Sequence, residues 1–169
     1  MRLTYLPGGP AHRPAVEDAL REHAADFIPT LNEKRIRSFA DDASRPDRAI
    51  LAFHKETLVG TFIFKPCEPH DLTKHSFTDV ERFRGYAYVR VLFVLPAFRN
   101  SGLGRRIRER GIDAIRAAGF GGVVATCWKK NETMKRINRA MGFLLVAAVP
   151  APWRGPGEES LIYKKEFPR

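Results

Sequence analysis

The stretch of residues 91–104 constrains the fold of this chain more than any other part of it. It begins with an apolar run, residues 91–95, which is typical of a buried strand. Pro96 ends that strand because proline has no N–H to donate to a neighbouring strand. A polar loop and two glycines follow, and from Leu103 onward the pattern predicts a helix. A strand that enters a helix through such a turn predicts an anion site, because the first helical N–H groups have no partner within the helix.

The residue types around the turn favour the same interpretation. Gly102 and Gly104 have no Cβ atom, so a ligand can approach the backbone closely. Arg99 and Arg105 flank the turn and can pair with phosphate oxygens. The alternative is a glycine turn without a ligand between a core strand and a surface helix, and the turn alone does not decide between the two.

Two common phosphate-binding motifs are excluded here. A P-loop needs Lys and then Ser or Thr directly after its second glycine, where this chain has Arg105 and Arg106. A dinucleotide fingerprint needs a third glycine at the position of Ile107. What remains is Arg99-x-x-Gly102-x-Gly104 after a Val-x-Pro strand end. This pattern resembles the acetyl-CoA-binding signature of the GNAT acetyltransferase superfamily, in which the loop amides hold the CoA pyrophosphate.

Length, apolar runs and cysteine content indicate the number of domains and the cellular compartment. The 169 residues predict a single domain, 1–169, with a core of its own. No apolar run approaches the ~20 residues of a membrane span, and the first ten residues have no signal-peptide h-region. Cys67 and Cys127 form no disulfide framework, which suits a reducing compartment. We therefore expect a cytoplasmic protein without a membrane span.

The net charge of +10 favours anionic partners, namely nucleic acid, an anionic membrane or a polyphosphate cofactor. No RNA- or DNA-binding motif is present, and the basic residues are spread along the chain. We therefore favour the polyphosphate cofactor and keep nucleic acid as a minor alternative.

The hydrophobic pattern predicts an alternation of strands and helices. The apolar strand at residues 122–127 follows the helix at residues 102–118. Together with the strand before that helix, it completes a strand–helix–strand unit without a tight turn, which predicts a parallel pair of strands. Segment 66–85 has little periodicity, and we expect a loop near an active site. The pattern predicts strands over residues 2–6, 49–53, 58–64, 85–95, 122–127, 144–149 and 160–167, and helices over residues 14–27, 33–43, 102–118 and 131–141.

A second motif strengthens the resemblance. Asn131 follows the second parallel strand, is a good helix N-cap, and precedes a helix that ends at Gly142-Phe143. GNAT proteins commonly have the same arrangement. The resemblance covers nearly the whole chain and implies an α/β (α+β) fold of GNAT type. In it, three layers are built around a mixed central sheet of about six to seven strands flanked by helices. The alternative is an unrelated α/β sandwich with an anion site at a helix start.

The resemblance also implies how acetyl-CoA, the acyl donor, is held. The two parallel strands would splay apart near Phe93 and Val94, whose backbone groups would bind pantetheine. Asn131 would reach the pantetheine arm. The pyrophosphate would be held by Arg99, Asn100, Ser101, Gly102, Leu103, Gly104 and Arg105.

One position departs from the family pattern. Many GNAT enzymes have a Tyr four residues before the second glycine motif, as proton donor to the departing thiolate, and this chain has Asn138 there. An amide is no general acid, although it can donate a hydrogen bond, and a thiol with a pKa of about 8.5 is a tolerable leaving group. Asn138 could orient CoA, water could supply the proton, Tyr163 could replace the usual Tyr, or Asn138 could be purely structural.

The base that deprotonates the amine is not identified by the sequence. Segment 66–85 contains titratable side chains and is expected to shape the acceptor pocket. It also contains three residue types that bind metals, but their spacing matches no standard zinc site, so we expect no metal. The candidate bases are Asp79, Glu81, His70 and His75, and the residues weighed as ligands are Cys67, His70 and His75.

These observations predict an acyl-CoA-dependent N-acetyltransferase. A primary amine would attack acetyl-CoA directly, and an N–H near Val94 would stabilise the tetrahedral oxyanion. The alternatives are a non-catalytic acyl-CoA-binding protein of GNAT fold and a basic nucleic-acid-binding module. The acceptor stays open among protein N-termini, lysines, polyamines, aminoglycosides and small amines. The oligomeric state is also open, with a homodimer as one option.

Overall fold

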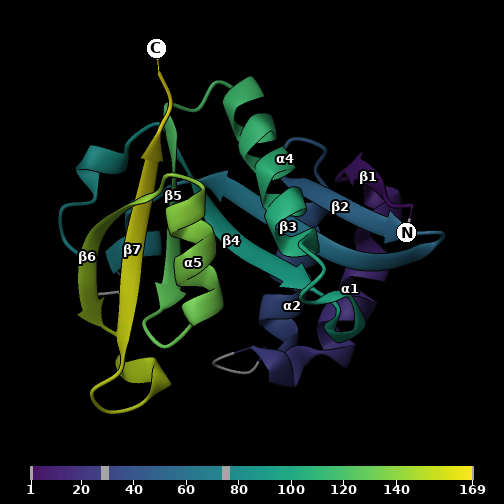
Figure 1. Ribbon diagram of the computed structural model, residues 1–169, viewed down its shortest axis with the longest axis horizontal. Coiled ribbons are helices and arrows are strands. Elements are labelled where there is room, and N and C mark those ends of the chain that lie inside the picture. Colours follow the sequence, from purple (N-terminus) through teal and green to yellow (C-terminus); the bar gives the residue numbers. More distant parts are fainter. Residues whose placement is uncertain (1, 28–30, 74–76, 169) are drawn as a thin grey trace. The chain divides into compact units, whose positions relative to one another are not determined.

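The computed structural model describes residues 2–27, 31–73 and 77–168 (Figure 1). Within these residues, seven strands form one mixed sheet in the order β1-β2-β3-β4-β5-β7-β6. A mixed seven-stranded sheet with helices confirms the predicted fold class. The strands are β1 Thr4–Pro7, β2 Ala49–His54, β3 Thr57–Pro66, β4 Tyr86–Val94, β5 Gly122–Trp128, β6 Leu144–Pro150 and β7 Glu159–Glu166, and the helices are α1 Arg13–Glu22, α2 Glu33–Ala43, α3 Pro69–Thr73, α4 Leu103–Ala117 and α5 Glu132–Ala140.

The chain forms two compact units. The first comprises residues 1–65 and 90–114, and the second comprises residues 66–89 and 115–169. Strands β1 to β3 with α1 and α2 belong to the first unit, and β5 to β7 with α3 and α5 belong to the second. Strand β4 begins in the second unit and ends in the first, and α4 passes from the first to the second. The expectation of a single domain over 1–169 stays a prediction.

The first unit buries apolar side chains on both faces of its strands. Alternation along β3 points Ile63 to one face and Phe62 to the other. Ile63 belongs to a cluster with Leu20 of α1 and Ile36 of α2, all at most 2% exposed. On the opposite face α4 lies against β3, where Gly111 meets the Phe62 ring. Figure 1 shows α4 crossing β3. The start of α4 is therefore fixed by contacts made along the helix.

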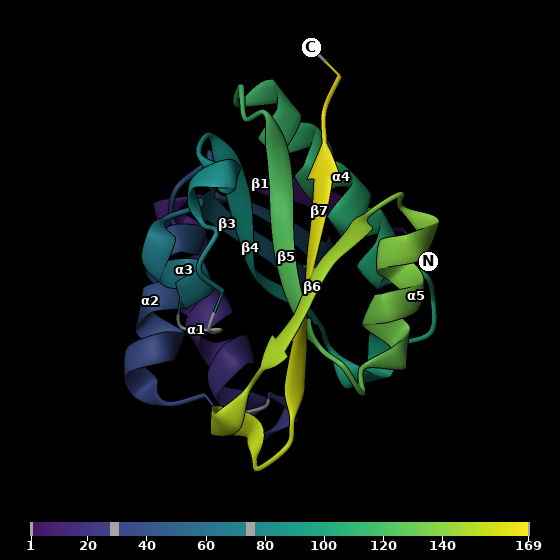
Figure 2. The same ribbon diagram turned by 90° about the vertical axis from the view of Figure 1, so that its left-hand side faces the viewer.

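The second unit contains the parallel pair that the sequence predicted. Tyr86 to Val89 of β4 pair in parallel with Gly122 to Ala125 of β5, and β7 pairs antiparallel with both β5 and β6. Figure 2 shows α3 and α5 on opposite sides of these strands. The side of α3 is apolar, because Leu72 packs with Val124 and Ile162.

Segment 66–85 is more ordered than its sequence suggested. It contains the unpredicted helix α3, and its 3₁₀ turn at Glu81–Phe83 agrees with the short helical turn that residues 80–83 predict. Leu72 and Phe83 are at most 1% exposed and contribute to the core of the second unit. The expectation of an irregular loop was therefore partly wrong, because these two side chains have a sheet face to cover. Whether the segment shapes an acceptor pocket stays a prediction.

Helix boundaries agree with the sequence where a cap is present. Helix α2 covers the predicted residues, and the side chain of Asn32 accepts a hydrogen bond of 3.0 Å from the Arg35 N–H. Helix α1 is shorter than predicted and ends at Glu22, because His23 leaves helical geometry at φ −109° and ψ 22°.

Helix α5 differs from the prediction in the residue that it buries. Apolar spacing along this helix predicts that Met134, Ile137 and Met141 face inward, but they are only half-buried. The fully buried residue is Asn138. The prediction was wrong because apolar periodicity does not reveal that an amide occupies the innermost position of the helix.

We expect Gly111→Ala to lower the free energy of unfolding by roughly 1–3 kcal/mol, as overpacking of a core does. A methyl group at position 111 would overlap the buried ring of Phe62. This loss should exceed the ~1 kcal/mol by which alanine favours a helix over glycine. Urea unfolding measures the difference.

The matched control is Gly104→Ala on the same helix, where the new Cβ would lie 3.6 Å from Cγ2 of Val94. That variant should be as stable as the wild type or more so. Equal stability of both variants would contradict the assigned contact between α4 and β3.

Candidate functional site

The loop before α4 presents a row of backbone N–H groups. A short 3₁₀ turn, Pro96–Phe98, follows β4, and Asn100 and Gly102 then take positive φ values of 61° and 76°. The first helical hydrogen bond runs from the Arg106 N–H to the Gly102 carbonyl, at 3.2 Å. Within the described part of the chain, the N–H groups of residues 100–105 donate to no backbone carbonyl. Successive free N–H groups in such a turn form a concave anion site.

Space above this loop is open. A Cβ built at Gly102 has no atom within 4 Å, and the positive φ favours glycine there. Ser101 tightens the turn, because its hydroxyl donates to the Phe98 carbonyl at 2.7 Å. The predicted residues from Arg99 to Arg105 are thus brought together by one turn, and the turn can accept a polyanion.

The arginines of the loop make contacts within the protein. Arg99 donates from Nε to the Val94 carbonyl at 3.1 Å and from Nη2 to Asp26 at 2.6 Å. Arg105 donates to Glu109, one helical turn away, at 2.8 Å. The expectation that Arg99 and Arg105 pair with phosphate stays a prediction, and the backbone N–H groups are the clearer anion ligands.

The end of β4 has one edge that β5 does not cover. The ladder with β5 ends at Val89. The Leu95 N–H donates to the Val59 carbonyl of β3 at 3.0 Å, and a Cβ built at Gly60 would lie 3.0 Å from the Phe93 carbonyl oxygen. Because backbone groups alternate along a strand, the N–H and C=O of Val94 point to the edge away from β3. At that edge, Nε of Arg99 donates a hydrogen bond to the Val94 carbonyl.

The second unit places the two predicted catalytic residues on one face. Tyr163 of β7 pairs with Ala125 of β5 and is diagonal to Cys127, so their side chains share a face. Asn138 of α5 lies on that face too, with Nδ2 4.0 Å from the Cys127 sulfur. Burial, with a smaller effect of Cys127, raises the pKa of Tyr163 above its usual range. The Tyr163 hydroxyl is therefore protonated at neutral pH and can donate a proton.

Asn138 carries a buried polar atom without a partner. The residue is fully buried, and its Oδ1 has no hydrogen-bond partner among the described residues. An unsatisfied buried oxygen costs about 1–3 kcal/mol, so a donor supplied by a ligand would be favourable here. The Oδ1 of Asn131, by contrast, is used as the predicted N-cap and accepts from the Met134 N–H at 3.0 Å.

The candidate bases are dispersed and exposed. Asp79 pairs with Arg82 at 3.3 Å, Glu81 and His70 are exposed, and His75 lies outside the described residues. A carboxylate that the sequence did not single out, Glu158, accepts hydrogen bonds from Lys130 and Trp128. Lys130 and then Trp128 lower the pKa of Glu158, so it is a weak base at neutral pH.

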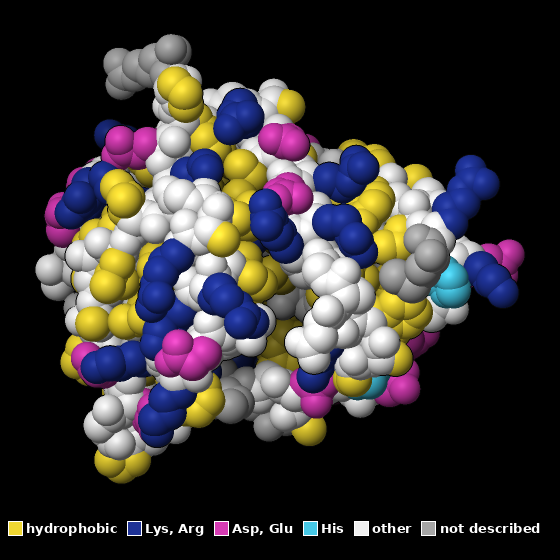
Figure 3. Space-filling view, viewed as in Figure 1, with side chains coloured by type: hydrophobic (Ala, Val, Ile, Leu, Met, Phe, Trp, Pro, Cys, Tyr) yellow, Lys and Arg dark blue, Asp and Glu magenta, His cyan; other side chains and the backbone are white. Residues whose placement is uncertain are grey.

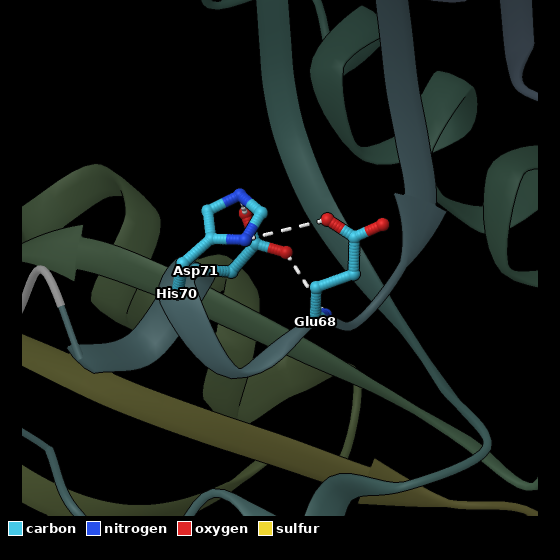
Figure 4. Close-up of side chains that lie close together, drawn as sticks. All are labelled: Glu68, His70 and Asp71. Atoms are coloured by element: carbon cyan, nitrogen blue, oxygen red, sulfur yellow. Dashed lines mark hydrogen bonds and ion pairs between the residues drawn. The ribbon is translucent and has the colours of Figure 1, made fainter.

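Glu68, His70 and Asp71 lie close together at the start of α3 (Figure 4). His70 is 3.4 Å from Glu68 and 3.6 Å from Asp71, while Asp71 accepts a hydrogen bond of 3.0 Å from the Glu68 N–H. The last contact is that of a capping box, in which the side chain of the third helical residue accepts from the N–H of the residue before the helix. Helix capping therefore accounts for the cluster. Cys67, which the sequence also offered as a metal ligand, is half-buried and does not belong to this cluster.

On the face drawn in Figure 3, Lys and Arg side chains are more prominent than Asp and Glu side chains. This agrees with the net charge of +10 and favours an anionic ligand.

Among the helices of the described residues, none has the length and apolar character needed to cross a membrane.

The glycine turn, the start of α4 and the parallel β4–β5 pair all lie within residues 16–143, a region that matches a known protein family. A model of the acetyltransferase (GNAT) family matches residues 16–143. The chain belongs to the GNAT acetyltransferase family. Family membership confirms the resemblance that the sequence suggested, and it agrees with the predicted enzyme class and with acetyl-CoA as the predicted acyl donor.

Two curated relatives align with parts of this GNAT chain. L-methionine sulfoximine/L-methionine sulfone acetyltransferase of Salmonella typhimurium is 34% identical over 77 residues, which cover 44% of this chain and 45% of the relative. L-amino acid N-acyltransferase MnaT of Escherichia coli is 28% identical over 113 residues, which cover 65% of this chain and 66% of the relative. The chain thus spans just under half and about two thirds of their lengths.

The GNAT fold is also seen in solved structures. The structure of yncA from Salmonella typhimurium, determined with its cofactor acetyl-CoA, superposes with a TM-score of 0.73 at 16% sequence identity. The match covers 100% of this chain and 96% of that chain. This likeness confirms the predicted three-layer GNAT fold.

We expect Asn138→Leu to raise the free energy of unfolding by about 1–2 kcal/mol, because it replaces a buried oxygen without a partner by an apolar side chain with the same branching. The same change should weaken acetyl-CoA binding if that oxygen accepts a hydrogen bond from the ligand. Urea unfolding and calorimetric titration measure the two effects.

Asn138→Asp is the matched control, since it keeps the shape but buries a carboxylate and should destabilise the protein. A clear loss of stability in Asn138→Leu would show instead that the amide is a structural element of the fold.

Proposed function

We propose that this protein is an acetyl-CoA-dependent N-acetyltransferase that acetylates the primary amine of a small α-amino acid or a close analogue. The observation that carries the proposal is the row of N–H groups at residues 100–105, which have no backbone partner within the described residues and include Gly102, where a built Cβ meets no atom within 4 Å. Such a row fits the pyrophosphate of CoA.

Residues of the first unit would hold the cofactor. The N–H groups of the loop from Asn100 to Arg105 would bind the pyrophosphate, and Arg99 would contribute positive charge through Nη1. The open edge of β4 at Phe93 and Val94 is suited to pantetheine, whose amides can pair with an exposed strand edge in the manner of an added strand. The resemblance to GNAT proteins assigns Asn131 to the pantetheine arm, and the structure gives its side-chain N–H groups no hydrogen-bond partner among the described residues.

Acetyl-CoA supplies an activated thioester, and the residues described here would direct its transfer. The neutral amine attacks the acetyl carbonyl carbon, the C–S bond breaks, and the amine loses a proton to water or a base. The Val94 N–H would stabilise the oxyanion. Tyr163, protonated at neutral pH, would donate a proton to the departing thiolate, and Asn138 would orient it.

A water relay is the proposed route for the proton that leaves the amine. Asp79 is paired with Arg82, and the carboxyl of Glu158 has a lowered pKa. Neither is therefore suited to act as a strong base. The role of segment 66–85 in shaping the acceptor pocket is part of this proposal.

The acceptor is proposed from two arguments. The names of both curated relatives refer to L-amino acids or to L-methionine derivatives. A protein of net charge +10 repels polycationic acceptors such as polyamines and attracts a substrate with a carboxylate. We further propose that the enzyme acts in the cytoplasm, where acetyl-CoA and free amino acids meet. A homodimer stays one option for its oligomeric state.

The first test is calorimetric titration of acetyl-CoA into the protein, with ATP as comparison. We expect micromolar binding of acetyl-CoA, and steady acetylation in a screen of L-amino acids, methionine sulfone and spermine. No binding of acetyl-CoA by folded protein would overturn the proposal. Binding without turnover on any amine would support a non-catalytic acyl-CoA-binding protein instead.

We expect Gly102→Asp to lower acetyl-CoA affinity by at least 100-fold, because its carboxylate would face the pyrophosphate in the row of N–H groups. Gly102→Asn is the matched control, since Asn and Asp have the same shape and both tolerate the positive φ at this position. The Asn variant should bind markedly more tightly than the Asp variant. Equal affinities would argue that no phosphate lies at this turn.

The raised pKa of Tyr163 gives a pH prediction. The hydroxyl stays protonated through neutral pH, so kcat should fall only above about pH 10, the usual tyrosine pKa. Tyr163→Phe should lower kcat by roughly 10²–10⁴-fold, the usual contribution of a general acid, and remove that alkaline decline. A Phe variant with wild-type turnover would leave water as the proton source.

A further inference from the structure

The peptide group between Val94 and Leu95 is held from both of its edges. Its N–H donates to the Val59 carbonyl at 3.0 Å, and its carbonyl accepts from Nε of Arg99 at 3.1 Å. A peptide group bonded on both sides has little freedom to rotate. The preceding N–H, that of Val94, is therefore fixed in direction as well.

The guanidinium that holds this carbonyl is itself held by a carboxylate. Nη2 of Arg99 lies 2.6 Å from Oδ2 of Asp26, so the Nε and Nη2 atoms are both used. Nη1 of Arg99 has no hydrogen-bond partner elsewhere in the described ranges. A planar guanidinium that is bonded at two atoms has a fixed orientation.

Asp26 is fixed on the end of β4 by its neighbours. It belongs to a 3₁₀ turn, Ala24–Asp26, in the connection between α1 and α2. The next residue, Phe27, stacks on Phe93 with ring centroids 5.6 Å apart, and the His23 ring lies 5.6 Å from the same ring. The position of Asp26 thus follows the position of Phe93.

The Asp26–Arg99 pair is poorly suited to a purely stabilising role. The side chains of Arg99 and Asp26 are 45% and 36% exposed. Ion pairs with this exposure contribute little to folding, because solvent screens them and ordering two side chains is unfavourable. The geometric effect of the pair on the Val94 carbonyl is its clearer consequence.

We propose that Asp26 is a positioning residue for acyl transfer. It holds Arg99 on the Val94 carbonyl, so that the Val94 N–H keeps a fixed direction toward the thioester oxygen. This inference rests on the proposed function, which places the thioester at the open edge of β4. Asp26 itself touches neither cofactor nor acceptor in this scheme and acts through Arg99.

The test compares Asp26→Ala and Asp26→Asn with the wild type in steady-state kinetics and acetyl-CoA titration. Asp26→Ala should lower kcat about 10- to 100-fold, as small displacements of reacting groups do, with less than a threefold change in the Kd of acetyl-CoA. Asp26→Asn keeps an oxygen acceptor for Nη2 and should recover most of the lost kcat. Thermal unfolding should show a similar midpoint for all three proteins.

A double-mutant cycle tests whether Asp26 affects kcat through Arg99 or through a general effect on the structure. In an Arg99→Ala background, Asp26→Ala should change kcat less than twofold, because the residue through which it acts is gone. Asp41→Ala is the control, since it breaks a similarly exposed ion pair with Arg13 in the same unit and should leave kcat unchanged. Additive losses in the cycle would overturn the proposal.

Other outcomes distinguish failure of the positioning role from failure of the proposed function. Tighter acetyl-CoA binding by Asp26→Ala, with kcat unchanged, would mean that Asp26 competes with phosphate for Arg99 and would overturn a positioning role. A wild-type protein that binds no acetyl-CoA would refute the proposed function itself. A wild type that binds and turns over, beside an Asp26→Ala variant with unchanged kcat, would refute this inference alone.

Discussion

The hydrogen bonds on the two sides of the Val94–Leu95 peptide group are the constraint on which the site depends. One comes from β3 and the other from Arg99, so strand β4 ends in a defined direction. Pro96 then stops the strand, and the turn with positive φ at Asn100 and Gly102 leads into α4. A polyanion that binds the N–H groups of this turn lies directly after the strand end. In the proposed function, the backbone would therefore provide two groups, a place for phosphate and an N–H donor.

Close contact between α4 and β3 keeps the start of the helix in place. Gly111 allows the helix to approach the Phe62 ring, and Ile107 lies against Gly60 in the same way. On the opposite face, α1 and α2 pack against Ile63, Val91 and Phe93. An interior packed on both faces has few alternative arrangements. The precision of the turn therefore derives from contacts along the whole helix and not from the turn itself.

The second unit combines polar groups in a way that stability alone does not favour. Asn138 is fully buried with an oxygen that lacks a partner, and Tyr163 is buried close to Cys127. A leucine at position 138 would satisfy the core at least as well. Groups that are unfavourable for folding often serve a ligand. In the proposed function, Asn138 and Tyr163 are the two groups that would act on the departing thiolate.

The sequence by itself determined most local features of this protein. Proline, glycine and apolar periodicity located the strands and α4, Asn131 marked a helix start, and the Arg99-x-x-Gly102-x-Gly104 turn indicated the family, because each signal acts within a few residues. The tertiary structure decided what depends on distant residues. Asp26 and Arg99 are 73 positions apart, and no local pattern predicts their contact. The burial of Leu72 and Asn138 likewise depends on which sheet face each one meets, and only the folded chain brings those faces together.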